Sequence, residues 1–210
     1  MTTVVIAHYN EDLNWTNQID RTRFNVQIYS KTNREYNFHE PNRGNEATAY
    51  LKYIVDNYDS LPEHNIFLHG HDSAYHQEIL NTVLLQSLKL TPAFNYFNIN
   101  RRDYYIHDFI NQYPKEYNLL KQYWTFEGIL IPEQMSFYSC AQFYVHRSLI
   151  LKHPKSLYEN MIEWLNTTNM DSELGVGTNF YSARIFEYMW HVIFTGDGKE
   201  PEHTYKELFD

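Results

Sequence analysis

The segment from His69 to His76 gathers three histidines and one aspartate within eight residues, directly after an apolar stretch. Imidazole and carboxylate groups are ligands of Mn²⁺, Zn²⁺ and Fe²⁺. Gly70 would let the backbone approach a bound group closely. The other interpretation is a polar turn between a strand and a helix, with Asp72 or Ser73 as the helix cap. The pattern therefore predicts a metal or diphosphate contact or a capped turn, and the sequence leaves both open.

A second candidate is the pair Glu187 and His191, which lies in the apolar stretch 186–191. On a helix these two residues are four positions apart and face the same way. Together they could supply a base and a contact to a metal or phosphate. Their apolar neighbours are expected in the core, and a buried carboxylate without a partner is costly. If the helix is internal, Glu187 therefore needs a partner or a function.

Two further residues are chemically suggestive when taken alone. Arg43 precedes a predicted helix, whose first backbone N–H groups are a natural anion site, but a solvated arginine beside a capped helix start is the simpler interpretation. Cys140 lies in the largely apolar run 137–143. A thiol nucleophile needs an exposed, electropositive setting, so the sequence predicts a buried structural thiol.

The elements that must position these residues follow from hydrophobic patterning. The apolar run 4–6 predicts a strand buried on both faces, and 24–29 and 66–68 predict two more strands. Residues 44–58 have helical apolar spacing, with Asn42 or Asn45 as the expected cap. This order predicts an α/β fold with a parallel sheet, whose strand ends meet at one edge. Those ends are 8–11, 31–33 and 69–72.

The second half of the chain has weaker patterns. It predicts helices over 75–88, 154–165 and 179–194, and a strand or packed turn over 135–145. The aromatic and polar stretch 91–130 predicts long loops. No linker divides the chain, so we expect a single domain over 1–210.

Composition excludes several classes of protein. Seventeen basic and 26 acidic residues give a net charge of −9, which argues against a nucleic-acid binder. The chain lacks an 18-residue apolar stretch, so no membrane span is expected. No glycine-rich dinucleotide fingerprint or P-loop follows the first predicted strand. One cysteine cannot form an internal disulfide, which favours a reducing compartment.

Six blocks in order give the chain a resemblance to a known family: 7–15, 41–51, 54–62, 67–71, 139–143 and 186–191. The chain resembles an uncharacterised-domain family of glycosyltransferase-like proteins of the GT-A type, and is most similar to the glycosyltransferase domain encoded by chlorella viruses. The resemblance implies a GT-A-like fold, in which a mixed, mostly parallel sheet is flanked by helices. It also implies a UDP-sugar donor and a divalent cation, Mn²⁺ or Mg²⁺.

The resemblance also implies a set of site residues. The nucleotide sugar would be held by His8, Tyr9, Asn10, Glu11, Lys31, Arg43, Asn45 and His71. The usual metal motif is Asp-x-Asp, whereas this chain has His71-Asp72 at that place. Asp72, His71 and His191 are therefore the expected metal ligands. Glu187 is the expected catalytic carboxylate, which would deprotonate the acceptor hydroxyl or stabilise positive charge on the sugar.

The resulting expectation is a metal-dependent transfer of a hexose or deoxyhexose from a UDP-sugar, with UDP-glucose as the first candidate, to a glycan or glycoprotein acceptor. Two alternatives stay open: a nucleotide-sugar-binding module without catalysis, and a metal-dependent phosphoesterase. The expected location is the cytoplasm, or the host cytoplasm if the protein is viral. The chain could also be one domain of a longer protein.

Overall fold

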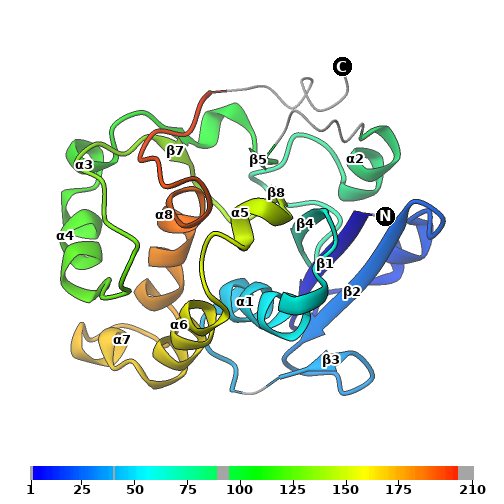
Figure 1. The fold of residues 1–210 in the computed structure, drawn as a ribbon, viewed down its shortest axis with the longest axis horizontal. Coiled ribbons are helices and arrows are strands. Elements are labelled where there is room, and N and C mark those ends of the chain that lie inside the picture. The colour runs from blue at the N-terminus through cyan, green and yellow to red at the C-terminus, as the bar shows by residue number, and fades with distance from the viewer. Residues whose placement is uncertain (1, 40, 89–94, 203–210) are drawn as a thin grey trace.

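A six-stranded mixed sheet forms the centre of the protein (Figure 1). The computed structural model describes residues 2–39, 41–88 and 95–202. The strand order is β3-β2-β1-β4-β8-β5. Neighbouring strands run parallel from β3 to β4, and β8 runs antiparallel to β4 and β5. The strands are β1 (Thr2–His8), β2 (Phe24–Ser30), β3 (Asn37–Phe38), β4 (His64–His69), β5 (Tyr96–Asn98) and β8 (Phe143–His146).

Helices flank this sheet, and a small two-stranded sheet lies beside it. The α-helices are α1 (Asn45–Asn57), α2 (Asn81–Ser87), α3 (Phe109–Gln112), α4 (Pro114–Tyr123), α5 (Arg147–Ile150), α6 (Lys155–Thr167), α7 (Met170–Glu173) and α8 (Tyr181–Thr195). The 3₁₀ helices are η1 (Asn14–Gln18), η2 (Tyr58–Ser60) and η3 (Arg102–Tyr104), and the small sheet pairs β6 (Tyr105–Ile106) with β7 (Phe137–Tyr138). The predicted α/β class with a mixed, mostly parallel sheet is therefore confirmed.

The strands alternate between two hydrophobic clusters because successive side chains point to opposite faces of a sheet. Val5 of β1 and Phe67 of β4 join the larger cluster, where α1, α6 and α8 pack. Val4 and Leu68 join the smaller cluster, which η1 and α2 cover. Figure 1 shows α1, α6 and α8 grouped beside β1 and β4, with α3 and α4 beyond α8.

Helix α1 confirms the predicted helix over 44–58, but neither expected cap is used. Gly44 precedes the helix with a φ of 70°, a left-handed conformation that glycine adopts readily. Its N–H donates to the Asn179 side-chain oxygen, 2.8 Å away. The expectation that Asn42 or Asn45 caps α1 was wrong, because the acceptor comes from a segment 135 residues further along the chain.

The second half departs further from the sequence patterns. The helix predicted over 75–88 shortens to α2, because the chain turns back so that the Asn81 N–H donates to the Asp72 carbonyl oxygen. Within 91–130, of which 91–94 lie outside the described residues, the structure places β5, β6, α3 and α4 where loops were expected. The predicted strand over 135–145 splits into β7 and the start of β8. The helices predicted over 154–165 and 179–194 are confirmed as α6 and α8.

None of the helices in the described part of the chain combines the length and the apolar character needed to cross a bilayer.

Candidate functional site

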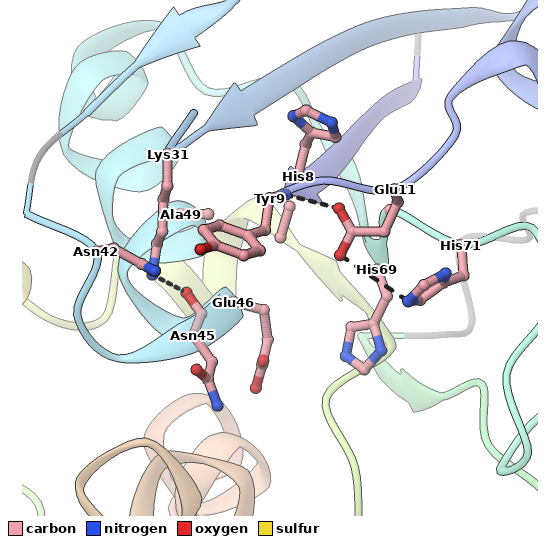
Figure 2. Close-up of a pocket in the computed structure, with 12 residues that line it drawn as sticks. His8, Tyr9, Glu11, Lys31, Asn42, Asn45, Glu46, Ala49, His69 and His71 are labelled. Carbon is pink, nitrogen blue, oxygen red and sulfur yellow. Dashed lines mark hydrogen bonds and ion pairs between the residues drawn. The ribbon is translucent and has the colours of Figure 1, made fainter. Parts of the chain in front are cut away.

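A pocket of about 340 Å³ opens at the carboxyl ends of β1 and β4, beside the start of α1 (Figure 2). Three parallel strands end here, so residues distant in sequence converge. We call it the strand-end pocket. It is lined by Ala7, His8, Tyr9, Glu11, Lys31, Asn42, Asn45, Glu46, Ala49, His69, Gly70 and His71.

The strand-end pocket contains part of the predicted site. Six predicted residues line it: His8, Tyr9, Glu11, Lys31, Asn45 and His71. Five do not: Asn10, Arg43, Asp72, Glu187 and His191. Glu46 and His69 line it although the sequence assigned them no definite role. The signal for Glu46 was its place in the first turn of a helix that follows a strand end.

Glu11 is held across the mouth of the pocket by its neighbours. Its Oε2 accepts from the Tyr9 N–H at 2.6 Å, and its Oε1 lies 3.9 Å from the Nε2 of His71. A Cβ on Gly70 would come within 2.7 Å of the Glu11 carboxylate. Glycine at position 70 therefore makes room for this carboxylate, instead of for a bound ligand as the sequence suggested.

Lys31 ties the end of β2 to the start of α1. Its Nζ donates to the carbonyl oxygen of Arg43 at 2.6 Å and to that of Asn45. Burial lowers the pKa of Lys31 to about 8, and the negative charge of Glu46 opposes that shift. Lys31 therefore positions the α1 start and contributes a positive charge to the pocket that weakens as the pH rises through 8.

Two carboxyl groups, one of them in the lining of the pocket, influence each other's ionisation. Glu46 lines the pocket, and Glu187 belongs to α8, which packs against α1. Burial raises the pKa of both groups, and the charge of Glu46 raises the pKa of Glu187 further. At neutral pH this arrangement favours retention of a proton.

Two polar side chains behind the pocket have unused hydrogen-bonding atoms. The Nε2 atoms of His69 and Gln142 are buried, with no hydrogen-bond partner among the described residues. The Gln142 side-chain oxygen accepts from the backbone N–H of His69 at 2.9 Å, which orients the Gln142 amide group. Burial lowers the pKa of His69 to about 4, so its ring is neutral at pH 7. Because buried polar atoms are normally paired, these two are consistent with a polar ligand in the pocket.

The predicted metal ligands do not assemble. Both Asp72 carboxylate oxygens accept from Thr82, one from its N–H at 2.8 Å and the other from its hydroxyl at 3.1 Å. Asp72 thus anchors the start of α2 from outside the helix, whereas the N-cap position belongs to Leu80 and not to Asp72 or Ser73 as the capped-turn interpretation expected. In residues 2–39, 41–88 and 95–202, no three His, Cys, Asp or Glu side chains are grouped to hold a metal ion.

His191 lies apart from the strand-end pocket. Its Nε2 is 3.2 Å from the carbonyl oxygen of Gly198, and its ring stacks on Phe137 at 5.0 Å. It lines a second cavity, of about 460 Å³, together with Glu200. The helical spacing was right, but Glu187 and His191 contact different parts of the protein, because Glu187 meets the Cys140 backbone.

A family model described as a protein of unknown function, DUF3431, matches residues 3–207. No curated protein matches the chain.

Proposed function

The chain belongs to this family of proteins of unknown function, and from that premise we propose that the strand-end pocket binds a nucleotide sugar and that the protein is a glycosyltransferase. The proposed donor is a UDP-sugar, and the transferred group is a hexose or deoxyhexose. The proposed acceptor is a glycan or glycoprotein. The resemblance in sequence to GT-A-type glycosyltransferases supports this choice, and the sheet has the mixed, mostly parallel form that such a fold requires.

The observation that carries the proposal is the convergence of polar side chains at the ends of three parallel strands. Open α/β sheets bind ligands beyond the carboxyl ends of their strands. The pocket combines the neutral imidazole of His69 and the amide of Asn45 with the ring of Tyr9. Neutral donors and acceptors beside an aromatic ring suit the hydroxyl groups and apolar faces of a sugar or nucleoside.

A diphosphate in this pocket would need positive charge, because Glu11 and Glu46 line it and the chain carries a net charge of −9. Lys31 supplies part of that charge. Mn²⁺ or Mg²⁺ remains part of the proposal, but with Glu11 and His71 as its protein ligands, since Asp72 is occupied by Thr82. Such an ion would neutralise the negative charge that develops on the departing diphosphate.

Glu187 remains the carboxylate proposed from the sequence for proton transfer. Its raised pKa suits a group that exchanges a proton near neutral pH, because general catalysis is most efficient there. Glu46, which lines the pocket, is the carboxyl group whose charge acts on Glu187. The acceptor hydroxyl would lose its proton to this pair as it attacks the sugar.

Thermal unfolding with added ligands tests the proposal. UDP is expected to raise the melting temperature only when Mn²⁺ is present, and GDP is expected to have little effect. Glu11→Gln should remove the metal-dependent part of the shift, whereas Asp72→Asn should keep it. A shift that disappears in Asp72→Asn but persists in Glu11→Gln would return the metal to Asp72.

A binding module without catalysis is the second candidate. It is favoured by the engagement of Asp72 with Thr82, which leaves the place of the usual metal motif without a free carboxylate. UDP binding that does not depend on Mn²⁺, without turnover of UDP-glucose in the presence of acceptor glycans, would support it. Hydrolysis of a simple phosphomonoester without UDP-sugar turnover would support a phosphoesterase instead.

A further inference from the structure

Four aromatic rings form a continuous cluster that leads from the strand-end pocket to the protein surface. His69 ends β4 and lines the pocket, and Figure 2 shows its ring there. The ring centroid of His76 lies 5.1 Å from that of His69 and 5.2 Å from that of Tyr75. The ring of Tyr104, at the end of η3, lies 5.7 Å from Tyr75 and 6.3 Å from His76. We call these four residues the ring cluster.

The outer end of the ring cluster is open to solvent. The side chain of Tyr75 is 75% exposed, more than any other tyrosine, phenylalanine or tryptophan in the described part of the chain. His76, against which it packs, is buried. An aromatic ring that is exposed on one side and supported by other rings on the other side presents a defined apolar face to a partner.

Hydrogen bonds fix the inner part of the ring cluster. The Nδ1 of His76 lies 2.5 Å from the side-chain oxygen of Asn100. The side-chain nitrogen of Asn100 donates to the side-chain oxygen of Asn98 at 2.6 Å, so the Asn100 oxygen accepts and Nδ1 of His76 carries the hydrogen. The Tyr104 carbonyl oxygen accepts from the N–H and the hydroxyl of Ser139, at 3.0 and 3.1 Å. The rings are therefore held in place before any ligand binds, which lowers the entropy cost of binding.

The inner end of the ring cluster has an unused hydrogen-bonding atom. The Nε2 of His69 is buried and has no partner among the described residues, while the backbone N–H of His69 donates to Gln142. A buried polar atom without a partner costs stability. A hydroxyl group suits this atom, because a hydroxyl can both donate and accept. The inner end of the ring cluster therefore favours a hydroxyl group, and the outer end favours an apolar face.

A carbohydrate combines these two properties. A sugar ring has an apolar face that stacks on an aromatic ring, and hydroxyl groups around its edge. An apolar peptide would leave Nε2 of His69 unpaired. A phosphate would be repelled by Glu11 and Glu46, which line the pocket with His69. A neutral glycan also suits a chain with a net charge of −9.

We propose that the ring cluster is the acceptor subsite, in which one sugar unit of the acceptor glycan stacks on Tyr75 and Tyr104 and the next unit hydrogen-bonds to His69. This inference rests on the proposed function for the identity of the donor. It adds the place where the acceptor binds and the kind of acceptor. Because the ring of His76 lies between the two contacts, two linked sugar units are needed to span them.

Binding of sugars in the absence of a donor tests the subsite. The probe is an array of neutral oligosaccharides of one to six units, and calorimetry with the best-bound member gives the Kd. Tyr75→Ala is expected to weaken binding about tenfold, because it removes the stacking face, whereas Tyr75→Phe should bind within about twofold of wild type. Tyr113→Ala is the matched control, since Tyr113 is an exposed tyrosine that stacks on Phe109 outside the ring cluster.

The contact at His69 is tested by the length of the sugar. His69→Leu should weaken binding of a disaccharide about fivefold or more and leave binding of a monosaccharide unchanged within about twofold. The melting temperature of Tyr75→Ala should equal that of wild type, because the side chain is exposed, so that lost binding is not lost folding. A wild-type protein that binds no member of the array, or binding that persists unchanged in Tyr75→Ala, would overturn the subsite.

Transfer kinetics distinguish this inference from the proposed function. With UDP-glucose as donor, Tyr75→Ala should raise the KM for the oligosaccharide about tenfold while the Kd for UDP changes less than about twofold, because Tyr75 does not line the pocket. If oligosaccharides bind through Tyr75 but wild-type protein neither binds UDP nor transfers sugar, the proposed function fails and the ring cluster stands as a glycan site. If transfer occurs and Tyr75→Ala leaves the acceptor KM unchanged, this inference alone is wrong.

Discussion

The two faces of the central sheet differ in what they hold. The larger cluster links the rings of Tyr50, Phe67, Phe143 and Trp190, with centroids 5.0 to 6.0 Å apart. The smaller cluster receives only aliphatic side chains from β1 and β4, and η1 and α2 cover it. Both clusters bury apolar surface, and both border the strand-end pocket: Ala49 of the larger cluster lines it, and Trp15 of the smaller cluster donates from its Nε1 to the carbonyl oxygen of Gly70 at 2.7 Å.

The aromatic side chains of the larger cluster also bring hydrogen bonds into the interior. Tyrosines in the larger cluster carry hydroxyl groups that bind main-chain and side-chain oxygens, as Tyr50 does with Ala141 and Tyr53 does with Asn65. Aromatic rings with a polar end can thus bring hydrogen bonds into a packed interior. The smaller cluster has such polar ends as well, because Trp15 donates to the Gly70 carbonyl oxygen and the Tyr144 hydroxyl lies 2.8 Å from Nδ1 of His64.

The largest expected effect compares neighbouring residues of β4 that face opposite clusters. Phe67→Ala should cost about 3–5 kcal/mol of unfolding free energy, and Leu68→Ala about 2–5 kcal/mol, because both side chains are fully buried. Only Phe67→Ala should also change the pH dependence of stability between pH 5 and 8, since Phe67 packs on Tyr50 beside Glu46. Urea unfolding at both pH values measures both effects. An equal change in the pH dependence of stability in Leu68→Ala would contradict this expected difference between the two clusters.

The next prediction concerns Glu200, a buried carboxyl group that lies away from the strand-end pocket. Burial raises the pKa of Glu200 to about 8, above the value near 4.5 of an exposed glutamate. The folded state therefore binds this proton more tightly, and the stability it contributes is present below pH 4.5 and is lost as the pH rises through 8. Glu200→Gln should gain on the order of 1–3 kcal/mol at pH 8 relative to pH 5 in urea unfolding. This gain should be unchanged in a Glu46→Gln background, whereas that of Glu187→Gln should shrink.

The next largest effect is expected from the substitution of Asp171. Its carboxylate accepts from the N–H groups of Asn179, Tyr181 and Ser182 and from the Ser182 hydroxyl, at the start of α8. Asp171→Ala should cost about 2 kcal/mol, because it leaves buried donors without a partner. Calorimetric melting measures this loss. Asp59→Ala, at an exposed position, should change stability by less than about 0.5 kcal/mol.

The smallest expected effect lies on the partly exposed side of α1. Lys52 and Asp56 form an ion pair one helical turn apart, and both side chains are 36% exposed. Lys52→Gln should cost less than about 0.5 kcal/mol in urea unfolding and still less in 1 M salt, because exposed pairs are screened. A cost above 1 kcal/mol would show that α1 depends on its surface as much as on its buried face.

The first half of the fold could be predicted because its signals are local. The β-branched run 4–6 and the helical spacing of 44–58 each define one element, and strand-end geometry then brings His8, Lys31 and His71 together. The helix cap could not be predicted in this way. Its acceptor, Asn179, belongs to a distant segment. The rule for helix caps considers only residues close to the helix start in sequence, so it carries no information about such a partner.

Part of the site could be predicted because its signals are local, and the rest could not because it depends on distant partners. Strand ends locate Glu11 and His71, but the sequence does not show that Thr82 occupies Asp72. Helical periodicity places Glu187 and His191 on adjacent turns without revealing which neighbours each one meets. Glu46 was visible as a helix-start residue, and only the packing of α8 on α1 lets its charge act on Glu187.

The contact between Gly44 and Asn179 gives α1 and α8 a common starting point, because Asp171 holds the Asn179 N–H while Asn179 accepts from Gly44. The number of residues between this contact and Glu46 or Glu187 fixes the direction in which each side chain leaves its helix axis. Each residue added inside α8 ahead of Glu187 would turn the carboxyl group by about 100° around the helix axis. Evolution can therefore vary the length of the loop between Asp171 and Asn179 more freely than the number of residues from Asn179 to Glu187.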